Sequence, residues 1–297
     1  MTRLINRSTR LLIQGITGRE ARMVTRHMLD YGTSVVSGVT PGRGGQNVEG
    51  VPVFDTIRQA VTATQPSASL VSVPPAATLD AVSEAIEGGI PLVVIATEGI
   101  PQHDVMRMLE LADQHGTVII GPNSVGVIRP ADGVKIGAIG GENPERAFVP
   151  GRIGVISRSG GMTSEIGLTL RLAGTGVSTA VSVGGDALIG STPATLLAEF
   201  QSDPDTDAVV LFGEPGTRFE EDVAHRISSG EFSKPLVALI AGEFTERLPA
   251  GTAFGHAAAI IEGGSGRPSS KRAALEQAGA SVAKSLDDIF DLLQSNT

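Results

Sequence analysis

The sequence predicts an α/β protein made of two parallel-sheet domains in succession. Short apolar runs alternate with helical patterns along almost the whole chain, which is typical of parallel strands joined by helices. The length of 297 residues favours two domains over one. Aromatic residues make up only 3% of the chain, so Val, Ile, Leu and Ala must build the cores, which suits buried parallel sheets.

The first 130 residues hold five apolar runs that predict strands and three periodic stretches that predict helices. Pro74 and Pro75 end the third strand. The second helix ends at Gly88 and Gly89, and the third ends at Gly116. The first helix carries its apolar residues on one face, as expected of a helix that lies on a sheet. The strands are expected at residues 11–13, from 35 onward, 69–73, 92–96 and 118–120, and the helices at residues 19–31, 78–88 and 102–115.

Between about residues 129 and 151 the alternation lapses and Gly and Pro accumulate, which is typical of a linker. The pattern then restarts with a strand, a glycine turn and a helix. We therefore predict a first domain over residues 1–130, a linker over 131–150 and a second domain over 151–297. Its strands are expected at residues 153–156, 177–183, 208–212 and 236–240, and its helices at 161–173, 192–201, 219–229 and 270–278, with 285–294 closing the chain.

Charge and composition exclude several classes of function. The net charge of −9 argues against a general polyanion binder, and the scarcity of aromatic residues argues against a nucleic-acid surface. Residues 1–130 are nearly neutral and all their basic residues are arginine, so this half is the better candidate to meet a charged anion. The absence of Cys excludes disulfides and thiolate chemistry, and no metal site is expected. Without an apolar run long enough for a bilayer or a signal sequence, a cytoplasmic protein with no membrane partner is expected.

Glycine turns mark the candidate sites in the first half. Residues 15–18 (Gly-Ile-Thr-Gly) join a strand to a helix whose free N–H groups could bind an anion beside Arg19 and Arg22. The spacing is not Gly-x-Gly-x-x-Gly, and the second strand runs into the glycine-rich loop 38–45 without an acidic residue for a ribose. A dehydrogenase that uses NAD is therefore disfavoured. A ligand with phosphates fits better, although ordinary tight turns would explain the spacing equally well.

The second half offers residues 157–163 (Ser-Arg-Ser-Gly-Gly-Met-Thr), where a strand meets a helix. The site could bind an anion, or its serines could simply cap the helix. Glu214 lies in a tight turn after a later strand, although surface carboxylates are usually just solvated. His256 is flanked by Gly and Ala and is therefore open to approach, unlike the other four histidines, although a lone histidine is more often structural.

Taken together, these stretches resemble the α subunit of the succinate–CoA ligase (succinyl-CoA synthetase) family over nearly the whole length. The resemblance rests on the order and spacing of residues 15–18, 38–45, 96–101, 121–123, 157–165, 183–186, 213–214 and 255–257. It implies an amino-terminal Rossmann-like CoA-binding domain followed by a flavodoxin-like parallel-sheet ligase domain.

The resemblance also implies roles for single residues. His256 is similar to the histidine that is phosphorylated in the family, and Glu214 to the glutamate that orients it. Ser157, Ser159, Gly160 and Gly161 stand where the family holds the phosphate. The residues similar to CoA contacts are Thr17, Gly18, Arg19, Glu20, Ala96, Thr97 and Glu98, with Arg43 in place of a family lysine.

The implied reaction proceeds through an acyl phosphate and a phosphohistidine, which is covalent catalysis. The chain lacks a Gly-x-x-x-x-Gly-Lys-Ser/Thr loop. ATP or GTP must therefore be bound elsewhere. The resemblance implies that the nucleotide and Mg²⁺ are held mainly by a nucleotide-binding β subunit of the ATP-grasp type, without which this chain should be inactive.

The acid substrate is left undecided because the sequence departs from the family around the acyl site. Ser164 stands where the family usually has Tyr, and Ala187 replaces a Pro. These changes favour a larger or differently charged carboxylic acid over succinate. The candidates are therefore succinate or another small carboxylate such as malate. An alternative hypothesis is a non-catalytic CoA or dinucleotide sensor, in which His256 would take no phosphate.

Overall fold

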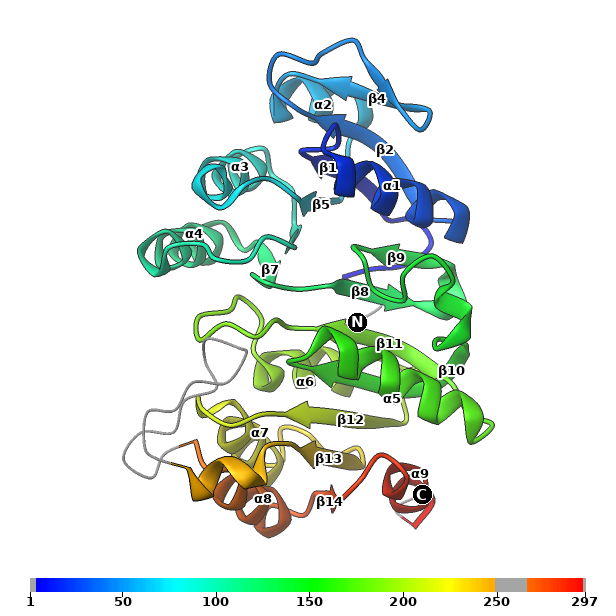
Figure 1. Cartoon of the computed structure of the whole chain (residues 1–297), viewed down its shortest axis with the longest axis vertical. Helices are drawn as coiled ribbons and strands as arrows, with labels where there is room; N and C mark the ends of the chain where they lie inside the picture. Colours follow the sequence, from blue (N-terminus) through cyan, green and yellow to red (C-terminus); the bar gives the residue numbers. More distant parts are fainter. Residues whose placement is uncertain (1–3, 249–265, 296–297) are drawn as a thin grey trace. The chain divides into compact units, whose positions relative to one another are not determined.

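The computed structural model describes residues 4–248 and 266–295 (Figure 1). It divides into two compact units, and each is described by itself. The amino-terminal unit comprises residues 2–144 and 188–191, and the carboxyl-terminal unit comprises residues 145–187 and 192–297. The division after Pro144 falls inside the linker predicted over residues 131–150. His256 lies outside the described residues.

A parallel sheet forms the centre of the amino-terminal unit. Its strands lie in the order β3-β4-β2-β1-β5-β6-β7, and neighbouring strands are parallel except for the antiparallel pair β3 and β4. Leu12, Val71 and Val93 on three of these strands are completely buried, as expected for strands covered on both faces. The strands are β1 (Arg10–Gln14), β2 (Ser34–Val39), β3 (Asn47–Val48), β4 (Val51–Phe54), β5 (Ala68–Val71), β6 (Leu92–Ile95) and β7 (Val118–Ile120).

Four helices connect these strands: α1 (Arg19–Tyr31), α2 (Ile57–Thr64), α3 (Pro75–Glu87) and α4 (Gln102–His115). Helix α3 begins three residues earlier than predicted because Pro75 occupies its first position, where a missing N–H costs nothing. From β1 the chain continues to β2 on one side in the sheet, and from β5 it continues to β6 on the other side. Right-handed crossovers therefore put α1 and α3 on opposite faces of the sheet (Figure 1). The order of strands reverses between β1 and β5, which is where such sheets bind ligands.

Part of the segment expected to be a linker is regular structure. Strands β8 (Gly126–Arg129) and β9 (Val134–Ile136) form an antiparallel hairpin, which Gly133 turns with a positive φ of 65°. The Thr33 hydroxyl donates a hydrogen bond of 2.8 Å to the Lys135 carbonyl and accepts one of 2.9 Å from its N–H. Gly133 therefore marks the tight turn of a folded hairpin.

Lys135 on β9 is completely buried and donates from Nζ to the Gly141 carbonyl. Burial lowers its pKa to about 8. Below pH 8 the amine is charged in both the folded and the unfolded chain. Between pH 8 and about 10.4 only the unfolded chain binds the proton, so stability should rise with pH across this window, by at most about 3 kcal/mol.

We therefore expect Lys135→Met to remove this rise. Urea unfolding of wild type and variant at pH 7.5 and pH 9.5 measures the change in the free energy of unfolding. Lys284→Met, at an exposed position, should keep the wild-type dependence on pH. An unchanged slope in Lys135→Met would contradict the assignment.

Within its described residues, the carboxyl-terminal unit holds five parallel strands in the order β14-β13-β12-β10-β11. They are β10 (Pro150–Ser157), β11 (Val177–Ser182), β12 (Ala208–Gly213), β13 (Leu236–Ile240) and β14 (Ser281–Ala283). The helices are α5 (Gly160–Leu172), α6 (Pro193–Ser202), α7 (Phe219–Ser228), α8 (Pro268–Gln277) and α9 (Asp288–Ser295). The two parallel sheets with their connecting helices confirm the predicted α/β class. None of the helices in the described ranges has the length and apolar character needed to span a bilayer.

Candidate functional site

The carboxyl ends of β1, β2, β5 and β6 carry two hollows, each of about 560 Å³. Both are lined by Gly18 and residues 72–74, so we treat them together as the sheet-edge groove. Gly15 begins the turn after β1 with a φ of 79°, and its carbonyl accepts a hydrogen bond of 2.9 Å from the Gly18 N–H. This turn aims the start of α1 at the groove.

Seven of the eight residues proposed for CoA line the groove: Thr17, Gly18, Arg19, Glu20, Ala96, Thr97 and Glu98. Thr97 is fixed by a hydrogen bond of 2.8 Å from its hydroxyl to the Val73 carbonyl. Arg43 is the exception, because it lies exposed in the loop after β2 and does not line either hollow.

The chemistry of the groove changes along its length. At one end α1 begins without a side-chain cap, so its first N–H groups and the exposed Arg19 favour an anion. At the other end Val39 and Ala77 form an apolar wall beside the carboxylates of Asp80 and Glu84. Such a wall suits a flat heterocycle with N–H donors. Asp80 and Glu84 were not singled out from the sequence, and their spacing of four residues on α3 was the signal available.

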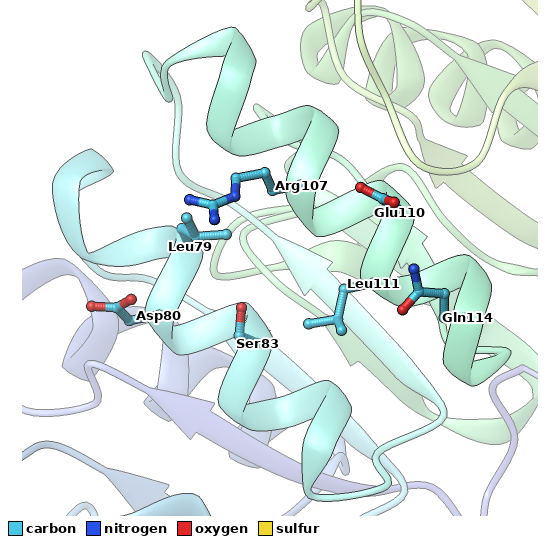
Figure 2. Close-up of a pocket in the computed structure, with 7 residues that line it drawn as sticks. All are labelled: Leu79, Asp80, Ser83, Arg107, Glu110, Leu111 and Gln114. Atoms are coloured by element: carbon cyan, nitrogen blue, oxygen red, sulfur yellow. The ribbon is translucent and has the colours of Figure 1, made fainter.

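Another hollow, of about 430 Å³, lies between α3 and α4 (Figure 2). Leu79 and Asp80 line it from α3, and Arg107, Glu110 and Leu111 line it from α4 (Figure 2). It opens between two helix faces rather than at the ends of strands. It contains none of the residues proposed from the sequence.

In the carboxyl-terminal unit, residues 157–161 form the junction of β10 and α5. The Ser159 hydroxyl accepts a hydrogen bond of 3.4 Å from the Met162 N–H and caps α5, so the capping role considered from the sequence is filled. Ser157 is buried and its hydroxyl donates to the Ser159 carbonyl at 2.7 Å. The cap leaves the N–H groups of Gly160 and Gly161 without an acceptor within the described part of the chain, so they can bind an anion.

Arg158 is the feature of this junction that sequence reasoning missed. Its side chain is 1% exposed, and no carboxylate among the described residues lies within ion-pair distance. The guanidinium donates to the Gly185 carbonyl at 3.3 Å, the Pro215 carbonyl at 3.5 Å and the Thr217 hydroxyl at 3.4 Å, and it lies 5.3 Å from the centre of the Phe219 ring. Its Nε makes no hydrogen bond within the described residues. A buried positive charge without a carboxylate partner favours an anion nearby.

Glu214 lies in the turn directly after β12, next to the β10–α5 junction. Ser157 pairs with Phe212 across the two strands, and the Arg158 N–H donates to the Phe212 carbonyl at 3.4 Å. The strand order of this unit reverses at β10, so both segments lie where ligands bind such sheets. Ser164, proposed for the acid substrate, is half-buried in the second turn of α5. No group of three metal-ligating side chains occurs within the residues that the structure describes.

Two family models match the chain. A CoA binding domain matches residues 6–99, which include β1, α1 and every residue that lines the sheet-edge groove. A succinyl-CoA ligase like flavodoxin domain matches residues 150–295, which correspond to the carboxyl-terminal unit.

Similar proteins span the full length. Subunit alpha 2 of an ADP-forming succinate–CoA ligase from Archaeoglobus fulgidus is 43% identical and covers 99% of both chains. The ADP-forming sulfoacetate-CoA ligase subunit SqwL from Acholeplasma sp is 42% identical over 99% of this chain and 98% of that protein. The solved ATP citrate lyase of Methanosaeta concilii, in complex with (3S)-citryl-CoA, has a TM-score of 0.90 at 25% identity. It covers 98% of this chain, which spans 50% of that one.

Proposed function

The chain belongs to the family of succinate–CoA ligase α subunits, and from this membership we propose that it is the α subunit of a nucleotide-dependent, NDP-forming acid–CoA ligase. One observation carries the proposal. The segment that matches a CoA binding domain folds into a groove lined by seven of the eight residues proposed for CoA. The anionic phosphates would meet the start of α1 and Arg19, and the adenine would meet the apolar wall beside Asp80 and Glu84.

The reaction we propose proceeds in three transfers. The imidazole of His256 attacks the γ-phosphorus of the nucleotide and releases the nucleoside diphosphate. The acid carboxylate takes this phosphoryl group from His256 and becomes an acyl phosphate. The CoA thiolate attacks the acyl carbon, forms the thioester and releases inorganic phosphate.

The described residues support this scheme through charge and position. Ser157 and Ser159 shape the start of α5, and the N–H groups of Gly160 and Gly161 would bind the transferred phosphoryl group. Glu214 would fix the tautomer of His256, which leaves the other ring nitrogen free to attack. ATP or GTP and Mg²⁺ would be held mainly by an ATP-grasp type β subunit.

For the acid we propose a small carboxylate with a second acidic group. Relatives named for succinate and for sulfoacetate are about equally similar to this chain, and both acids have that character. Ser164 in place of a family Tyr would leave room for an acid other than succinate, such as malate. Assaying the complex with a panel of acids tests this proposal. A clear preference for an acid with one acidic group would contradict it.

The decisive experiment uses the chain purified with its β subunit and ATP labelled at the γ-phosphate. We expect an acid-labile, base-stable label that disappears in His256→Ala, with thioester formation lost by at least about 1,000-fold. Glu276→Gln, a change at an exposed position in the described part of the same unit, should keep both activities. Tight CoA binding without any label would instead support the sensor hypothesis.

A further inference from the structure

A completely buried ion pair lies beneath the turn that carries Glu214. Lys271 on α8 and Glu220 on α7 are both 0% exposed, and the Lys271 amine contacts the Glu220 carboxylate directly. Glu221 adds a second carboxylate 3.9 Å from the amine, and burial raises the pKa of Glu221. Removing two charges from water costs so much that a pair of apolar side chains is often as stable or more so. Stability alone therefore does not explain why the pair is there.

The remaining hydrogen bonds of the pair go to the turn itself. The Glu220 carboxylate accepts a hydrogen bond of 3.3 Å from the Glu214 N–H. The Lys271 amine donates one of 2.7 Å to the Gly216 carbonyl. The ion pair therefore makes a hydrogen bond to the backbone of the turn at two residues, Glu214 and Gly216.

The turn has a shape that it would not readily keep without such contacts. Gly216 and Thr217 have φ values of 76° and 51°, a region that a residue such as Thr rarely adopts. Gly213 lies so close to Glu220 that any side chain there would collide with the carboxylate. Glu220 and Lys271 therefore help to hold the backbone of residues 213–217, together with Arg158, which donates to the Pro215 carbonyl and the Thr217 hydroxyl.

We propose that Lys271 and Glu220 are positioning residues that set the place of the Glu214 carboxylate. The inference rests on the proposed function, in which Glu214 orients His256. Neither residue touches the reacting atoms. Each acts through the backbone of the turn, and a displacement of about 1 Å at such a group can cost about 100-fold in rate.

The test variant is Lys271→Met combined with Glu220→Leu, because removing both charges leaves no unpaired ion in the core. In the complex with the β subunit, we expect the rate of His256 labelling by γ-labelled ATP to fall by about 30- to 100-fold. The KM for CoA should change by less than about twofold, since CoA is assigned to the other unit. Arg152→Met combined with Asp207→Leu removes an exposed ion pair of the same unit and should label at the wild-type rate.

The coupling to Glu214 separates positioning from a structural effect. If the pair acts through Glu214, adding both apolar substitutions to Glu214→Gln should slow labelling no further than Glu214→Gln alone. If the combined variant loses labelling rate by the product of the two separate losses, the proposal is overturned. It is also overturned if the apolar double variant labels at the wild-type rate. Lys271→Gln with Glu220→Gln keeps neutral hydrogen-bonding groups and should label faster than the apolar pair. An equally slow amide pair would count against positioning, and the amide variant provides the test if the apolar pair does not fold. A wild-type complex that takes no label would overturn the proposed function itself.

Discussion

Replacing Arg158 by methionine is expected to lower the rate of His256 phosphorylation by at least about 100-fold in the assembled complex. Methionine preserves much of the buried volume but removes the charge and every donor. The Gly185 and Pro215 carbonyls and the Thr217 hydroxyl would lose their buried partner. The loops after β11 and β12 would then no longer be hydrogen-bonded to the residue just before α5. The phosphoryl group is proposed to bind at the start of this helix.

A matched control lies on the same helix. Arg171 is in the last turn of α5, is exposed, and donates to the Arg146 carbonyl at 2.7 Å. Arg171→Met should therefore leave the rate of labelling by γ-labelled ATP within about twofold of wild type. The labelling rate of Arg158→Lys should lie between those of wild type and Arg158→Met. Lysine keeps the positive charge but cannot reach several acceptors with one planar group. A rate within threefold of wild type in Arg158→Met would show that the phosphoryl site does not depend on this charge.

The main elements of the fold could be predicted because each is marked within its own segment. Apolar runs such as residues 92–95 predict buried strands, and Gly32 and Gly116 end helices with positive φ values of 113° and 69°. The elements that were missed are short. Helix α2 has eight residues and β3 has two, too few for a periodic pattern to show. Strand β9 falls within the predicted linker because it has only three residues, with Gly133 before it and Gly137 after it.

The candidate site divides in the same way. Thr17, Gly18 and Thr97 follow strands, so their place at the edge of a sheet could be expected from the sequence. Arg158 could not be found in this way, because its burial depends on Gly185, Pro215 and Thr217, which come from two later loops. Lys271 and Glu220 are 51 residues apart in the chain. A sequence pattern shows that these residues are charged but not that folding brings them together away from water.

Gly15→Ala is expected to lower the affinity for CoA by at least about 30-fold. Gly15 has a φ of 79°, and a Cβ atom there would collide with the Ser72 carbonyl oxygen and touch the Val73 side chain. Backbone atoms cannot move aside as the end of a flexible side chain can, so β1 and β5 would have to separate at their carboxyl ends. The turn to Gly18 and the start of α1 would shift with them, which misplaces the N–H groups proposed to bind the phosphates.

Gly89→Ala separates this collision from backbone strain. Gly89 has a φ of 78°, almost the same as that of Gly15, but a Cβ atom there would meet nothing within 4 Å. Both variants should lose about 1–2 kcal/mol of stability from the left-handed backbone, and Gly15→Ala should lose more because of the collision, measured by urea unfolding. Only Gly15→Ala should weaken CoA binding, measured by calorimetry on the complex with the β subunit. Equal losses of affinity would mean that general destabilisation weakens binding. If only Gly15→Ala loses affinity for CoA, binding depends on the close approach of the turns after β1 and β5. This approach is the geometry that makes this edge of the sheet a binding site.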